Sequence, residues 1–246
     1  MFKWAVAQEM VPVTTHQALK TLEGLRRGEE GVRESAPVKP VPQEHIDAIR
    51  HHVSRQVWAM VQLQLLTGMR SQEVTLMRRA DMNMAEQLWT YRPSAHKTEH
   101  HDRVREIPLG PHAQKILRPF LKFDADAYLF SPVEAQKERN EERRRNRESP
   151  MTPSQSRRTP KSRRRRAPGV HYTSNTYRHA IVAAGKRAEV PRWHPHQLRH
   201  NFATAIRAKY GIETARALLG HRNVQTAELY AEQDRQTASQ VALAVG

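Results

Sequence analysis

The sequence predicts a mainly α-helical fold with a small antiparallel β-sheet, that is, an α+β domain. Apolar residues recur at helical spacing along most of the chain, and only residues 88–108 change to the shorter period of strands. Neither of the glycine-rich phosphate-binding patterns G-x-x-x-x-G-K-S/T and G-x-G-x-x-G occurs. These observations argue against a parallel α/β nucleotide-binding fold and against chemistry that depends on ATP or a dinucleotide.

The N-terminal part divides into a helical segment and a linker. Residues 1–28 carry apolar side chains at helix-like spacing. Residues 29–42 contain three prolines and few apolar anchors, which is typical of a linker. We therefore expect one larger domain over residues 43–246.

The larger domain begins with a long amphipathic region. Its apolar face extends from Ile46 to Leu66 and stops at Gly68, because glycine suits the end of a helix. Ser71 is a good N-cap and predicts a second helix over residues 72–79.

Two short strands are expected next, over residues 88–91 and 104–108, and the polar stretch between them puts Lys97 near the turn of a hairpin. The remaining helices are expected at residues 111–123, 173–187, 196–210, 213–219, 225–232 and 237–244.

Residues 134–168 interrupt this pattern. They are low in complexity and have no apolar face that a core could bury, which predicts a flexible or partly helical insertion. From Glu134 to Arg166 there are 13 Lys and Arg against 5 Glu, so 13 − 5 gives +8, half of the net charge of +16. Its run of Arg163, Arg164, Arg165 and Arg166 is a weak candidate for binding the DNA backbone, or else a solvated loop.

The charge of the whole chain indicates a polyanionic partner, most commonly nucleic acid. Cysteine is absent, which excludes disulfides and cysteine-based zinc sites. No stretch approaches the ~18 uncharged apolar residues of a membrane span, and the N-terminus has no apolar signal-peptide core. We expect a cytoplasmic protein.

Several residues could together cut a phosphodiester bond without a metal. Such a reaction needs rigid cations against the non-bridging oxygens, a general acid and a nucleophile. Arg70 stands near a helix start with Glu73 three residues on, and His196 and Arg199 share one helical face. Paired histidines such as His194 and His196 lack further ligands at a recognisable spacing, so no metal site and no cofactor are expected.

The order of motifs resembles the phage-integrase type of tyrosine recombinase over about residues 41–246. The motifs are G-x-R-x-x-E at Arg70, a hairpin lysine at Lys97, H-x-L-R-H at residues 196–200, L-G-H ending at His221, and Tyr230 nine residues later. Each motif alone is weakly specific, whereas five in this order and spacing are strongly specific.

The resemblance implies a role for each matching residue. Arg70 and Arg199 would bind the scissile phosphate, and His196 would contact it and support proton transfer. Lys97 would protonate the leaving 5′ oxygen, and His221 would donate to a phosphate oxygen. Tyr230 would attack, which leaves a 3′-phosphotyrosyl bond and a free 5′ hydroxyl. Glu73 and His200 would support these groups.

The resemblance also implies partners: double-stranded DNA, and a homo-oligomer, a tetramer on paired sites. Family members carry a helical core-binding domain before the catalytic domain, so we expect residues 1–28 to be the last helix of a truncated one. Two alternatives stay open, a type IB topoisomerase-like nicking enzyme and a catalytically inactive or truncated DNA-binding module. An RNA-binding protein ranks last, because no aromatic RNA-binding signature occurs.

Overall fold

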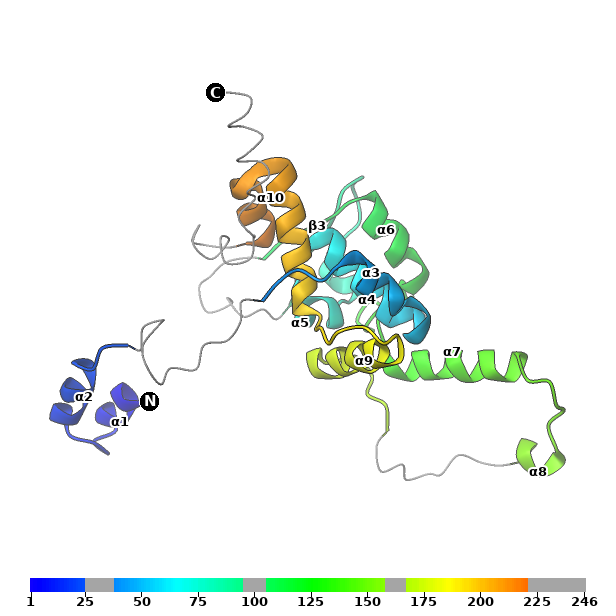
Figure 1. The fold of residues 1–246 in the computed structure, drawn as a ribbon, viewed down its shortest axis with the longest axis horizontal. Helices are drawn as coiled ribbons and strands as arrows, with labels where there is room; N and C mark the ends of the chain where they lie inside the picture. Colours follow the sequence, from blue (N-terminus) through cyan, green and yellow to red (C-terminus); the bar gives the residue numbers. More distant parts are fainter. Residues whose placement is uncertain (25–37, 95–104, 158–166, 221–246) are drawn as a thin grey trace. The chain divides into compact units, whose positions relative to one another are not determined.

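The computed structural model describes residues 1–24, 38–94, 105–157 and 167–220, and their ribbon is shown in Figure 1. The chain falls into two compact units, Met1–Val38 and Lys39–Gly246. The first unit contains two short helices, α1 (Phe2–Ala7) and α2 (Val13–Lys20). The assignment of residues 1–28 to a core-binding domain stays a prediction.

The second unit consists mainly of helices. Its described helices are α3 (Gln43–Ala48), α4 (Arg55–Thr67), α5 (Ser71–Thr75), α6 (Pro111–Leu117), α7 (Pro132–Arg145), α8 (Pro153–Ser156), α9 (Ser174–Arg187) and α10 (His196–Leu219). Short 3-10 turns are η1 (Arg50–His52), η2 (Arg79–Asp81) and η4 (Arg118–Phe120). Among the residues that the structure describes, no helix is both long and apolar enough to cross a membrane.

Helix α4 lies at the centre of the hydrophobic core. The Ser54 side chain caps its first turn by accepting from the Val57 N–H. Val57, Met60 and Leu63 are almost fully buried and pack with residues of α6, α9 and α10. Burying apolar surface of this kind is the main favourable term in folding, so packing against the surrounding helices holds α4 in place.

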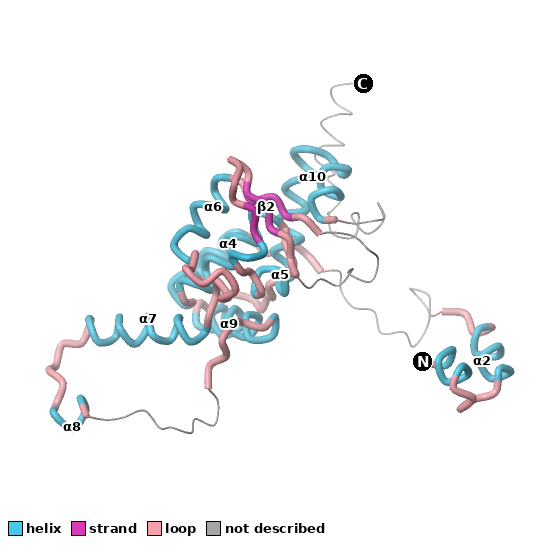
Figure 2. The backbone as a smooth tube through the Cα atoms, turned by 180° about the vertical axis from the view of Figure 1, so that it is seen from behind, coloured by secondary structure: helices cyan, strands magenta, loops and turns pink. Residues whose placement is uncertain are grey.

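A three-stranded antiparallel sheet stands beside α4 and α6 (Figure 2). Its strands are β1 (Met82–Asn83), β2 (Trp89–Tyr91) and β3 (Ile107–Leu109), and Tyr91 of β2 is paired with Ile107 of β3. The two strands expected from the sequence are therefore present, with slightly shifted ends. Lys97, in the connection between them, lies outside the described residues.

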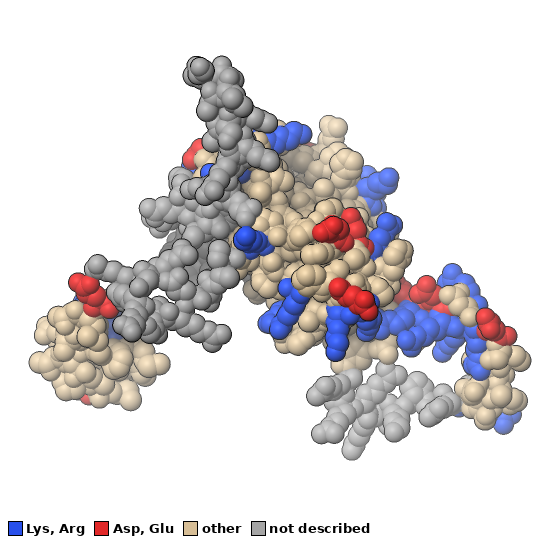
Figure 3. Space-filling view, in the orientation of Figure 1, with Lys and Arg blue, Asp and Glu red and all other residues tan. Residues whose placement is uncertain are grey.

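Helix α7 covers the first part of the basic segment. Glu134 and Glu138, near its start, form ion pairs with Lys122 at 2.6 Å and with Arg55 at 2.8 Å. From residue 140 to the end of the helix every side chain is exposed. Figure 3 shows basic side chains gathered along α7, with acidic ones among them. Arg163, Arg164, Arg165 and Arg166 lie outside the described residues.

Gly68 ends α4 in the left-handed conformation, with φ 63°. A Cβ atom there would overlap the Phe202 ring and would lie 2.9 Å from Leu219 Cδ2. Any other residue would also be strained by the positive φ, at about 1–2 kcal/mol. Gly68 therefore allows α10 to pack directly on the turn between α4 and α5.

We expect Gly68→Ala to lower the free energy of unfolding by at least about 2 kcal/mol, from backbone strain plus overpacking. Gly185→Ala is the matched control, because a Cβ there makes only an ordinary 3.5 Å contact with Val190 Cγ2. In the last turn of α9 that change should be neutral or stabilising. Urea denaturation measures both, and equal effects of the two substitutions would contradict the packing described here.

Candidate active site

The turn between α4 and α5 holds Arg70 and Glu73 together. The Glu73 carboxylate accepts from the Arg70 backbone N–H at 2.6 Å and from Arg70 Nη1 at 2.8 Å. Arg70 is thereby the residue that precedes α5, so the prediction of Ser71 as N-cap was wrong by one residue. The physical reason is that Glu73 reaches back to the N–H of Arg70, which starts the helix one residue earlier.

Glu73 is buried, yet it stays ionised. Burial by itself would raise the pKa of its carboxyl, but the Arg105 charge, the Arg70 N–H and the Arg70 guanidinium together hold it below the usual value. Its backbone carbonyl accepts from the Tyr91 hydroxyl at 2.8 Å, which ties α5 to the sheet. The carboxylate therefore acts as a fixed anion between two guanidinium groups.

Gln64 supports the same turn from within α4. Its side-chain amide donates to the Met69 carbonyl at 3.0 Å and accepts from the Tyr177 hydroxyl at 2.9 Å. Both ends of this buried amide are thus satisfied. The backbone just before Arg70 is fixed by a side chain on α4 and, through it, by α9.

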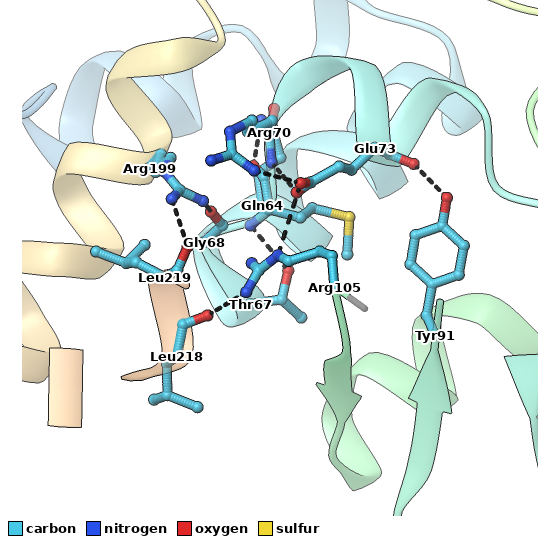
Figure 4. A network of polar contacts seen from close by, with 11 residues as sticks. Gln64, Thr67, Gly68, Arg70, Glu73, Tyr91, Arg105, Arg199, Leu218 and Leu219 are labelled. Atoms are coloured by element: carbon cyan, nitrogen blue, oxygen red, sulfur yellow. Dashed lines mark hydrogen bonds and ion pairs between the residues drawn. The ribbon is translucent and has the colours of Figure 1, made fainter. Parts of the chain in front are cut away.

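Helix α10 brings Arg199 to the other side of the turn. Arg199 is 1% exposed, and it donates from Nη1 to the Gly68 carbonyl at 2.6 Å and from Nη2 to the Leu219 carbonyl at 2.7 Å. Gly211, with φ 84°, interrupts α10 between the two helices expected from the sequence. Because of this kink, the end of α10 returns to the guanidinium at its beginning. Figure 4 shows Arg70, Arg105 and Arg199 around the turn.

His196 and His200 lie one helical turn apart in α10, with ring centroids 5.8 Å apart. Burial, and after it the charges of His200, Arg199, His194 and Arg70, together lower the pKa of His196 to about 4. Arg70 and Arg199 therefore both act on the same imidazole. The structure brings together four of the expected residues, Arg70, Glu73, His196 and Arg199, with His200 beside them.

The depressed pKa of His196 predicts a pH effect on stability. The unfolded chain takes up a proton near pH 6.5, whereas the folded chain takes it up only near pH 4. The contribution of His196 to stability is thus complete above pH 6.5 and is lost as the pH falls toward 4. Urea denaturation at pH 7 and at pH 4.5 gives the loss of unfolding free energy between the two pH values. This loss should be smaller in His196→Gln than in the unchanged protein, and an equal loss would contradict the lowered pKa of His196.

Arg105 also belongs to the site, although none of the motifs in the sequence includes it. Its side chain is 7% exposed, its Nε lies 3.6 Å from Glu73 Oε1, and its Nη1 donates to the Leu218 carbonyl at 3.0 Å. The sequence does contain a signal for it. Arg105, Ile107 and Leu109 alternate with exposed residues, so strand periodicity puts Arg105 on the buried face.

Three expected site residues, Lys97, His221 and Tyr230, lie outside the described residues, and their roles stay predictions. Within the described ranges, no three side chains of His, Cys, Asp or Glu gather as metal ligands would. The chemistry of the described part of the site is cationic: three arginines and a buried carboxylate surround one turn. The His196–His200 pair lies on the same helix as Arg199. Such an arrangement suits a phosphate oxygen anion.

The model of the phage integrase family matches residues 41–237, and this chain belongs to that family of tyrosine recombinases. The family expected from the order of the motifs is thus confirmed. Two relatives named integrase/recombinase, from Escherichia coli and Pseudomonas aeruginosa, are each 40% identical over 62 residues. These 62 residues span 24% of this chain and only 18% of each relative.

Solved structures confirm the fold class. XerA recombinase is 19% identical with a TM-score of 0.55, over 99% of this chain and 80% of its own. The Tn1549 transposon integrase in complex with a circular intermediate DNA is 13% identical with a TM-score of 0.59, over 94% and 74%. A lambda integrase dimer bound to a core site is 18% identical with a TM-score of 0.51, over 95% of this chain and 56% of its own.

Proposed function

We propose that this protein is a site-specific DNA recombinase or integrase that cuts and rejoins DNA strands through a 3′-phosphotyrosyl bond to Tyr230, without metal or ATP. The observation that carries the proposal is that Arg70 lies close to Arg199 and His196 of α10, although it is far from them in the sequence. Membership of the phage integrase family supports the same reaction class.

The two arginines would stabilise the five-coordinate phosphorane, in which charge accumulates on the non-bridging oxygens. Arg70 has 24% of its side chain exposed, so it is the guanidinium that a DNA backbone meets first. Arg199 reaches a phosphate only if it exchanges its bonds to the Gly68 or Leu219 carbonyl for phosphate oxygens when DNA binds. Glu73 keeps the Arg70 guanidinium oriented before and during DNA binding.

The remaining steps fall to residues expected from the sequence. A tyrosine hydroxyl has a pKa of ~10, so Tyr230 must lose its proton as attack proceeds, and nearby cations favour the anion. Lys97 would protonate the leaving 5′ oxygen, and His221 would donate to a phosphate oxygen. Reversal of attack by a 5′ hydroxyl would rejoin the strand and release Tyr230, so no external energy source is required.

Covalent capture on a nicked DNA substrate tests this function. The short strand beyond the cut diffuses away, so a covalent intermediate accumulates and migrates slowly in a denaturing gel. We expect an adduct that forms equally in EDTA and in magnesium. The absence of an adduct on any DNA would favour the inactive binding module, and loss of the adduct in EDTA would contradict the arginine mechanism.

Double-stranded DNA is the proposed partner, with a homotetramer on paired sites as the proposed assembly. Each phosphate neutralised by Lys or Arg releases counterions, so the logarithm of the affinity falls by about 0.9 per contact for each tenfold rise in salt. We expect a slope of about −4 or steeper in fluorescence anisotropy, from four or more contacts. A nearly flat slope would argue against binding through the backbone.

A further inference from the structure

Two buried guanidinium groups hold the last carbonyls of α10. The final four carbonyls of a helix lack partners within it. Here the Leu219 carbonyl accepts from Arg199 and the Leu218 carbonyl accepts from Arg105. Arg105 comes from the residues just before β3, and Arg199 from the start of α10. The end of α10 is thus held from two separate directions.

The same two arginines contact the turn that bears Arg70. Arg199 donates to the Gly68 carbonyl, and Arg105 forms an ion pair with Glu73, which in turn binds Arg70 (Figure 4). Arg105 therefore lies between the Arg70–Glu73 pair and the Leu218 carbonyl. A shift of the end of α10 would therefore reach Arg70 through Arg105 and Glu73, in addition to the bonds that Arg199 makes.

Gly220 confines the contact further. It has φ 66°, and a Cβ atom there would lie 2.8 Å from Arg105 Nη1. The backbone that leaves α10 thus passes directly against the guanidinium. His221 is the next residue, and Tyr230 follows ten residues after Gly220. The position of Gly220 therefore sets the starting point of the segment that carries His221 and Tyr230.

The buried guanidinium of Arg105 carries a cost to stability. Arg105 Nη2 is buried and has no hydrogen-bond partner among the described residues. A buried donor of this kind is costly, and a buried ion pair is often no more stabilising than apolar side chains of similar size. What a buried ion pair can supply is a unique arrangement of the elements that it joins.

We propose that Arg105 is a positioning residue that fixes the end of α10 against the Arg70–Glu73 pair, so that the segment carrying His221 and Tyr230 starts beside the phosphate-binding arginines. This inference rests on the proposed function and adds a residue to it. Arg105 itself need not touch the DNA. Its effect reaches the reaction through the Leu218 carbonyl and Gly220.

The test compares Arg105→Met and Arg105→Lys with Arg92→Met in the full chain. Arg92 also pairs with a glutamate, Glu106, at 2.6 Å, but its side chain is 65% exposed. Arg105→Met should slow adduct formation on the nicked substrate by about tenfold or more, the effect of losing one charge-assisted hydrogen bond. Its DNA affinity should stay within about threefold, because phosphate contacts dominate affinity. Arg105→Lys should be intermediate, and Arg92→Met unchanged.

A second substrate, with sulfur in place of the scissile 5′ oxygen, separates an effect on the position of the nucleophile from an effect on protonation of the leaving group. Sulfur leaves without protonation, so it removes any need for a general acid. If Arg105 positions the nucleophile, the loss persists on this substrate. A loss confined to the oxygen substrate, an unchanged rate, or a parallel fall in melting temperature, affinity and rate would each overturn the proposal.

Hydrogen exchange tests whether Arg105 holds the end of α10, and this measurement does not require catalytic activity. The Gly220 N–H bonds to the Ala217 carbonyl at 3.1 Å and reports on the end of α10. Arg105→Met should speed exchange there about tenfold, while Arg92→Met should not. If the unchanged protein forms no adduct on any DNA, the proposed function fails, and this readout still decides whether Arg105 holds the end of the helix; equal exchange in both variants would refute it.

Discussion

Tyr230→Phe should abolish covalent capture of nicked DNA, with no adduct above background. The change removes only the hydroxyl oxygen, so no nucleophile is left to attack phosphorus. Binding to DNA should be unaffected, because the change removes no positive charge from the protein. Gel analysis after denaturation measures the adduct, and fluorescence anisotropy measures the binding.

Tyr210→Phe is the matched control, because Tyr210 lies on α10 with 55% of its surface exposed. It should form the adduct at the same rate as the unchanged protein. An adduct that survives in Tyr230→Phe would show that another residue is the nucleophile. The motif spacing would then have identified the family without identifying the attacking group.

Arg70→Gln should slow adduct formation by about 10²–10³-fold, the usual effect of removing one donor that stabilises transition-state charge. Arg70→Lys should recover only part of this loss, because an ammonium cannot donate two parallel hydrogen bonds to a phosphate. The turn itself should survive, because the Arg70 backbone N–H still donates to Glu73. Single-turnover kinetics measure the rate.

Arg79→Gln serves as the control for this prediction. Arg79 is close in sequence, and its half-buried side chain donates to the Phe123 carbonyl in an exposed hydrogen bond. Its replacement should leave the rate within about twofold, as is usual for surface substitutions. Equal losses in Arg70→Gln and Arg79→Gln would mean that general surface charge, rather than the organised turn, supports the reaction.

Local pattern was enough to predict the elements that hold the site. Helical periodicity followed by Gly68 predicted the end of α4, and a two-residue period predicted the strands at β2 and β3. The i, i+3 spacing of His196 and Arg199 predicted that they share one face of α10. These features depend on residues close together in the sequence, so a single chain reveals them.

Long-range partners could not be predicted in the same way. The bonds from Arg199 to the Gly68 and Leu219 carbonyls depend on how α10 bends at Gly211 and packs on α4. Every residue has a backbone carbonyl, so the sequence does not indicate which carbonyls accept these hydrogen bonds. The alternation around Ile107 could have indicated that Arg105 is buried, but its partners Glu73 and Leu218 become visible only in three dimensions.

In the proposed reaction, the basic site around Arg70 and Arg199 directs a phosphate to Tyr230. Mass spectrometry of peptides from the purified protein–DNA adduct identifies the residue that is attached to the DNA. We expect one modified peptide, which contains Tyr230 and carries the phosphate from the 3′ end of the cut strand. A DNA remnant on any other residue, or one attached through the 5′ end, would contradict it.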